Sequence, residues 1–131
     1  METENKNKSS IATKKGVELE NRLIDFASRI LDLVDALPKK ATSKHIGGQI
    51  MRSGTSPALN YGEARAGESK ADFVHKLKIC TKELRETHIA LRIIQKQKWF
   101  PDTILEPILD ECNQLIAIFV ASLKKALLQK E

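Results

Sequence analysis

Five basic residues recur along one helical face in the middle of the chain, and they are well placed to bind an anion. They step by four, three, seven and four: Lys78, Lys82, Arg85, Arg92 and Lys96. A helix rises 1.5 Å per residue, so these cations would form a line about 27 Å long. Such a line fits the phosphates of RNA, bound by charge and shape rather than by base sequence. A charge row can equally be the solvated surface of a scaffold whose partner is another protein, and the sequence leaves both alternatives open.

A second polar set precedes this row, in a segment rich in Gly, Pro, Ser and Thr. Its members are Arg52, Ser56, Asn60, Tyr61 and Glu63. Asn60 and Glu63 are three residues apart and hence neighbours on a helix. We expect this set to form a subunit interface or a buried hydrogen-bonded network that fixes a kink or the subunit register. A ligand or RNA contact is the alternative, although Glu63 would repel phosphate.

No residue set is typical of catalysis, so we expect no enzyme activity, no cofactor and no metal. The sequence lacks the nucleophile-elbow, phosphate-loop, dinucleotide and zinc-protease motifs. Di-iron bundles carry Glu-x-x-His twice, yet here Glu83 is followed at that spacing by Glu86. The histidines and cysteines share no ligand spacing: His45, His75, His88, Cys80 and Cys112. We predict surface or boundary histidines and small, buried cysteines.

Composition indicates one helical domain without a membrane segment. The chain has 131 residues, of which 41% are hydrophobic and only 5% aromatic, so Leu, Ile, Val and Ala must build the core. No apolar run approaches the ~20 residues of a membrane span, and the first residues lack a signal-peptide core. We therefore expect a cytoplasmic protein. Residues 69–98 hold eight Lys or Arg against three Asp or Glu, whereas residues 17–37 and 102–131 are acidic.

Hydrophobic periodicity predicts four helices, over residues 17–37, 43–65, 69–97 and 103–129. Short connections between amphipathic helices indicate an all-α, antiparallel up-down-up-down four-helix bundle spanning residues 17–131. Residues 1–16 are polar and aperiodic, and we predict a disordered tail there. The second helix is expected to be kinked or broken near Gly54 and Pro57, which are poor helix formers.

The predicted third and fourth helices carry more apolar residues than one inward seam requires. The seam of the third helix alternates steps of four and three: Phe73, Leu77, Cys80, Leu84, Thr87, Leu91 and Ile94. Ser69 followed by Asp72 resembles the capping box that would start it, and Thr42 or Ser43 would cap the second helix. Surplus residues such as Ile89 and Ile93 predict self-association, because exposed apolar patches mark interfaces.

The segment 52–73 carries a family resemblance. It reads RSGTSPALNYGEARAGESKADF, and it resembles small bacterial four-helix bundle proteins encoded in intervening sequences of 23S ribosomal RNA genes. The matching positions are Arg52, Ser56, Asn60, Glu63, Ser69, Asp72 and Phe73. The resemblance covers about residues 17–128 and implies a homopentamer with a link to RNA and no catalysis. Here Pro57 directly follows the serine, where the family more often places Ser-Ile-Pro.

Overall fold

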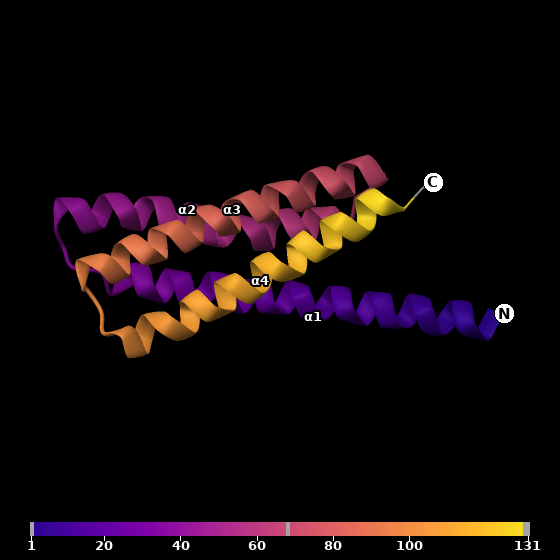
Figure 1. The fold of residues 1–131 in the computed structure, drawn as a ribbon, viewed down its shortest axis with the longest axis horizontal. Helices are drawn as coiled ribbons and strands as arrows, with labels where there is room; N and C mark the ends of the chain where they lie inside the picture. Colours follow the sequence, from indigo (N-terminus) through magenta and orange to yellow (C-terminus); the bar gives the residue numbers. More distant parts are fainter. Residues whose placement is uncertain (1, 68, 130–131) are drawn as a thin grey trace.

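Four long helices make up nearly all of the described part of the chain (Figure 1). The computed structural model describes the backbone of residues 2–67 and 69–129, and the side chains from residue 14 onward within these ranges. The helices are α1 (Glu2–Asp35), α2 (Ala41–Arg65), α3 (Lys70–Gln97) and α4 (Asp102–Leu128). Consecutive helices run antiparallel. The predicted all-α up-down-up-down bundle is confirmed.

Helix α1 begins much earlier than the sequence predicted. Its backbone is helical from Glu2, so the expected helix start at residue 17 is wrong, whereas the disordered tail over residues 1–16 stays a prediction. Residues 2–15 contain no glycine or proline, and extending a helix already fixed by packing adds one hydrogen bond per residue. The polar composition of this segment argues only against a packed core, and a helix can form without one. The first turns of α1 extend past the other helices (Figure 1), and the domain boundary at residue 17 stays a prediction.

Aliphatic and aromatic side chains from all four helices form one core. Its fully buried members include Leu23, Phe26, Ile30, Ile50, Leu77, Leu84, Leu91, Ile94, Leu105, Leu115 and Phe119. The predicted seam of α3 is buried from Leu77 to Ile94, with Phe73 half-buried at its start, and at the end of α4 Ala126 is buried while Leu127 is 63% exposed. A straight helix drifts against a fixed apolar repeat, so the inward face moves by one residue over several turns.

Helix α2 continues through Gly54 and Pro57, so of the predicted kink or break only the break is excluded. Glycine serves here for close packing. A Cβ atom at Gly54 would lie 2.8 Å from Ile30 Cγ2 and 2.9 Å from Ile30 Cγ1, so only glycine lets α1 and α2 approach this closely. Pro57 is buried, and its carbonyl oxygen accepts a hydrogen bond from Cys80 Sγ at 3.5 Å. The contact ties α2 to α3 at the residue that lacks an N–H.

The helix ends confirm one predicted cap and correct another. The Asp72 N–H donates to Ser69 Oγ at 3.1 Å, so Ser69 caps α3 as expected. On α2 the N-cap is Lys40 rather than Thr42 or Ser43. Ser43 already lies inside the helix, and its hydroxyl is within hydrogen-bond distance of the carbonyl oxygens of Pro38 and Lys40, to one of which it donates its single proton. At the same end of the bundle, Lys40 Nζ lies 5.5 Å from the Trp99 ring centre.

The four helix pairs are joined unequally. Helices α2 and α3 share the largest contact surface, whereas α1 and α4 meet over the fewest residues. The α1–α4 pair is linked by an ion pair between Arg22 and Glu111, with Nη2 and Oε1 2.6 Å apart. A groove of about 640 Å³ lies between these two helices, with Tyr61 and Phe73 among its lining residues. The bundle is therefore least closed between its first and last helices.

Candidate nucleic-acid interface

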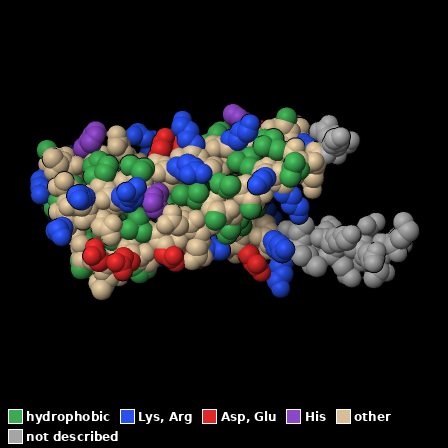
Figure 2. All heavy atoms as spheres, in the orientation of Figure 1, with side chains coloured by type: hydrophobic (Ala, Val, Ile, Leu, Met, Phe, Trp, Pro, Cys, Tyr) green, Lys and Arg blue, Asp and Glu red, His purple; other side chains and the backbone are tan. Residues whose placement is uncertain are grey.

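The predicted basic row lies on the outer face of α3. All five of its residues, Lys78, Lys82, Arg85, Arg92 and Lys96, are exposed. Figure 2 shows Lys and Arg side chains gathered over α2 and α3, with most Asp and Glu along the edge formed by α1 and α4. Within the described residues, none of the five forms an ion pair. Their positive charge is therefore free to act on a ligand.

Three cations of the row share a groove with residues of α2 and α4. This α3 groove has a volume of about 850 Å³. Its lining from α3 includes Lys78, Thr81, Lys82, Glu83, Arg85, Glu86, Ile89, Ala90 and Ile93; α2 adds Gln49, Arg52 and Ser53, and α4 adds Leu123. Arg92 and Lys96 lie outside this lining, further along the helix. The structure thus divides the predicted row into a groove part and an outer part.

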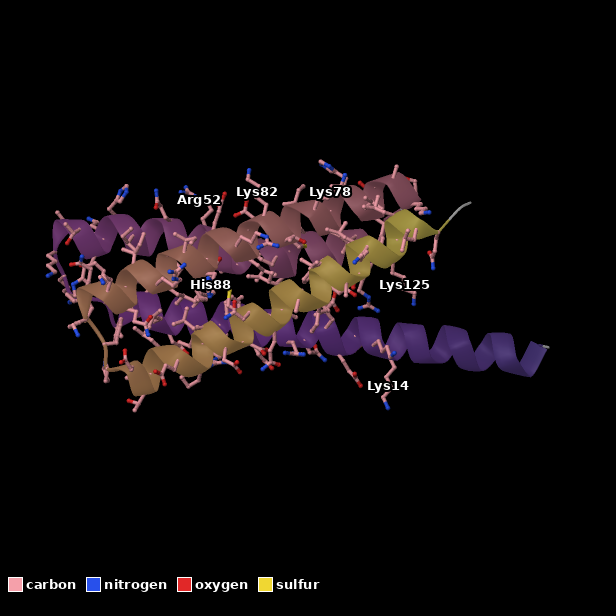
Figure 3. The ribbon with its side chains drawn as sticks, in the orientation of Figure 1. Lys14, Arg52, Lys78, Lys82, His88 and Lys125 are labelled. Carbon is pink, nitrogen blue, oxygen red and sulfur yellow. The ribbon has the colours of Figure 1, made fainter. Side chains whose placement is uncertain are left out.

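Arg52 belongs with the cations of α3. The sequence placed it in a polar network of α2, but its side chain is exposed and lines the α3 groove. Figure 3 shows Arg52, Lys82 and Lys78 following one another along the same edge of the bundle. Arg52 has no ion-pair partner among the described residues. Sequence spacing could not find this association, because the two helices are joined only through the fold.

The step of seven in the basic row skips an apolar residue. Ile89 lies four residues after Arg85 and three before Arg92, on the face of the cations, and it is 51% exposed. Ile93 is also exposed. The row is thus a line of cations with apolar side chains at its centre, which distinguishes it from a purely solvated face.

Two carboxylates lie among the groove cations. Burial, followed by the charge of Glu86, raises the pKa of Glu83, while Lys82 and Arg52 act in the opposite direction. Neither Glu83 nor Glu86 forms an ion pair in the part of the chain that the structure describes. Further along α3, burial lowers the pKa of His88, and the nearby Arg92 charge adds to this effect. The groove therefore presents both signs of charge without neutralising them.

The polar set predicted on α2 does not form one network. Asn60 Nδ2 donates to the Ser56 carbonyl oxygen at 3.0 Å and lies 2.9 Å from Ser56 Oγ, within one turn of the helix. Tyr61 is buried, with its ring edge-on to Phe119 at 5.6 Å. Glu63 pairs with Lys76 of α3, with Oε2 and Nζ 2.6 Å apart. These side chains serve separate contacts, because successive residues on a helix point in different directions.

The sequence analysis did not predict a buried contact between two hydroxyl groups. Thr87 Oγ1 lies 2.9 Å from Ser53 Oγ and 2.8 Å from the Glu83 carbonyl oxygen. A hydroxyl group carries one proton. Both hydrogen bonds can therefore form only if Thr87 donates to the Glu83 carbonyl oxygen and Ser53 donates to Thr87. The signal available in the sequence was Thr87 itself, a polar residue in an otherwise apolar seam. Its partner lies on another helix, where spacing gives no information.

Both cysteines of the chain are buried in the bundle as free thiols. Burial raises the pKa of both Cys80 and Cys112 to about 12, so both thiols are protonated near neutral pH. Cys112 Sγ donates to the Leu84 carbonyl oxygen at 3.4 Å. No three His, Cys, Asp or Glu residues gather into a possible metal site within the described ranges. Among the same residues, no helix is long and apolar enough to cross a membrane.

Comparison with known proteins places the chain in a family. Residues 15–121 match the family model described as 23S rRNA-intervening sequence protein. The chain belongs to this family. A solved structure with 29% sequence identity is similar to it, with a TM-score of 0.78 over 84% of this chain and 98% of the other. That structure is a protein with unknown function from the S23 ribosomal protein family of Bacteroides thetaiotaomicron. No curated protein matches the chain.

The family match confirms the resemblance inferred from the sequence. The match includes the whole of α2 and α3 and the segment 52–73 on which that inference depended. The matched range begins at residue 15, within α1, and ends at residue 121, within α4. The family therefore corresponds to the packed bundle and to the α3 groove upon it.

Proposed function

We propose that this protein is a non-enzymatic, cytoplasmic homo-oligomer that binds RNA weakly through the outer face of α3. The observation that carries the proposal is the exposed row of cations, none of which has an ion-pair partner among the described residues. Arg52 widens the row on its α2 side. Unpaired cations spread over an elongated face bind phosphates by releasing the counterions of the nucleic acid.

The comparisons support RNA as the class of ligand. The family is described by the 23S rRNA intervening sequence, and the similar structure is assigned to a ribosomal protein family. Neither description says which face of these proteins would bind RNA. The charge distribution of this chain supplies that face, since its positive side chains gather over α2 and α3 (Figure 2).

Charge reversal tests the RNA proposal. We expect wild-type protein to bind RNA with a non-specific Kd of about 10⁻⁴–10⁻⁶ M at physiological salt, with affinity falling as salt rises. The double variant Lys82→Glu with Arg85→Glu should bind more weakly and lose roughly two phosphate contacts from the salt slope. The matched control is Lys39→Glu with Lys44→Glu, which changes net charge equally outside the α3 groove. Equal weakening by both variants, or no RNA binding at low salt, would contradict the proposal.

Self-association is supported by apolar residues on the outside of the bundle. Val17, Ile24 and Leu31 are spaced by seven along α1 and are 41%, 51% and 42% exposed. An apolar residue once per heptad is typical of a helix that packs against another helix. On α4, Val120 is also exposed. The resemblance to the family favours a pentamer.

Light scattering tests the assembly. At micromolar concentration we expect a mass several times the 14.7 kDa of one chain. Ile24→Glu combined with Leu31→Glu should reduce this mass, because it buries charge in the proposed contact. A monomeric wild-type protein at every concentration would contradict this part of the proposal.

A protein partner is the second candidate function. Ile89 and Ile93 favour it, because they place exposed apolar surface among the cations of α3. The RNA titration separates the two functions. A row that binds no RNA even at low salt would leave the protein-scaffold role as the better explanation.

A further inference from the structure

We propose that the α3 groove selects single-stranded RNA over duplex RNA, and prefers bases that carry an amino group over uracil. This inference rests on the proposed RNA binding and adds the form of RNA to it. Its basis is the mixed lining of the groove, in which cations, carboxylates and apolar side chains lie together. Figure 3 labels three of the cations, Arg52, Lys78 and Lys82.

The charges of the groove are unusual in remaining separate. Four cations, Arg52, Lys78, Lys82 and Arg85, share the lining with Glu83 and Glu86. No ion pair within 4.0 Å joins a cation to a carboxylate in the groove, whereas Arg22, Arg65 and Lys76 each have a carboxylate partner elsewhere on the bundle. Glu86 lies close enough to Glu83 for its charge to raise the pKa of Glu83, after the larger effect of burial. Both signs of charge are thus available to one ligand.

A duplex fits only half of this surface. Its outside is a continuous polyanion, which the cations attract and the two carboxylates repel. The major-groove base edges of an A-form helix lie too deep for side chains to reach, and its shallow minor groove offers mainly 2′-hydroxyl donors. The phosphates that flank this minor groove repel Glu83 and Glu86, so the charge of the two carboxylates opposes duplex binding.

A single strand fits both halves. Its phosphates can contact Lys78 and Lys82, while its unpaired bases turn their edges toward the carboxylates. A carboxylate accepts hydrogen bonds only, so it binds the exocyclic amino groups of cytosine, adenine and guanine. Uracil can offer its N3–H donor, but the O2 and O4 carbonyl oxygens on either side of this N–H repel a carboxylate and weaken the contact.

Other side chains of the groove suit the faces of splayed bases. Arg52 and Arg85 carry planar guanidinium groups, on which unstacked bases can lie. Ile89 and Ile93 offer apolar surface beside them. A duplex keeps its base faces stacked and cannot use these contacts.

Fluorescence anisotropy with three RNA probes tests the inference. The probes are oligocytidylate, oligouridylate and a mixed-sequence RNA duplex of equal length, measured at one salt concentration near neutral pH. We expect wild-type protein to bind oligocytidylate about five-fold tighter than oligouridylate, which corresponds to the lower end of the discrimination from a specific base contact. The duplex should bind more weakly than either single strand.

Neutralising the two carboxylates should remove the selection. Glu83→Gln combined with Glu86→Gln keeps side-chain size and should tighten duplex binding several-fold, while the cytosine preference falls toward one. The matched control is Glu18→Gln with Glu106→Gln, two exposed residues outside the groove that change net charge equally. The control should tighten all three probes alike and keep their ratios.

The possible outcomes distinguish a failure of the proposed strand and base selection from a failure of the proposed RNA binding. Wild-type protein that binds all three probes equally, or a groove variant that shifts them as the control does, would overturn the selection while RNA binding stands. Failure of every probe to bind at low salt would overturn both. If the groove variant instead changes only the mass in light scattering, the groove is a contact between copies and the inference is wrong.

Discussion

The inner side of α2 and the outer face of α3 meet at Ser53, which contacts the buried Thr87 and also lines the α3 groove, yet the two regions use their residues in opposite ways. On α2, the unusual residues Gly54, Pro57 and Tyr61 are all buried in contacts with other helices. On α3, Lys78 and Lys82 have no ion-pair partner within the described residues. The unusual residues of α2 thus stabilise the bundle, whereas the cations of α3 stay exposed and can contact a ligand.

The strongest way to break this comparison is to add volume at the α1–α2 contact. Gly54→Val should destabilise the protein by about 3 kcal/mol, the upper part of the range for overpacking, because the stiff side chain of Ile30 lies 2.8 Å from the new Cβ. Gly48→Val is the matched control, since a Cβ there meets nothing within 4 Å, and its effect should stay within about 0.5 kcal/mol. Chemical denaturation measures both. Equal effects would mean that Gly54 does not set the helix spacing.

A hydroxyl pair gives the next largest effect and sharpens the comparison. Thr87→Val should cost about 2 kcal/mol, because it leaves the buried Ser53 hydroxyl without its partner. Ser53→Ala combined with Thr87→Val should cost less than the sum of the two single changes, since neither polar group then remains. A double-mutant cycle in denaturant measures this coupling. Additive costs would show that the two hydroxyls do not depend on each other.

The smallest expected effect is on the outer face. Lys82→Glu with Arg85→Glu should change the free energy of unfolding by no more than about 0.5 kcal/mol, since both side chains are exposed and unpaired among the described residues. Thermal unfolding of wild type and variant in the same buffer checks this. A loss comparable to that of Thr87→Val would mean that the row supports the fold, and the distinction between the two regions would fail.

The features predicted well from the sequence depend on neighbours along the chain. Helix existence, the Ser69 cap and the seam from Leu77 to Ile94 follow from spacing and local chemistry, and the structure confirms them. Glycine is ambiguous at this level, because it can end a helix or let two helices approach. Gly54 does the second, and only the position of Ile30 on another helix reveals it.

The candidate site was predicted in part for the same reason. The exposed cations of α3 share one helix, so their spacing was sufficient to place them on one face. Arg52 joins them across a helix pair, and the hydroxyl of Ser53 meets Thr87 across the same pair. Such contacts depend on helix register, which the apolar pattern of α2 defines weakly because small residues fill much of it.

Helices α1 and α4 contact each other over few residues, so a change in their separation can be followed in solution. Lys15 on α1 and Lys125 on α4 line the same groove, near the end of the bundle at which α4 ends and from which α1 extends (Figure 1). Arg22 with Glu111 provides an ion pair across that seam. A donor and an acceptor dye attached at these two lysine positions would report separation of the first and last helices through energy transfer. Such a reporter leaves the face of α3 free for titration.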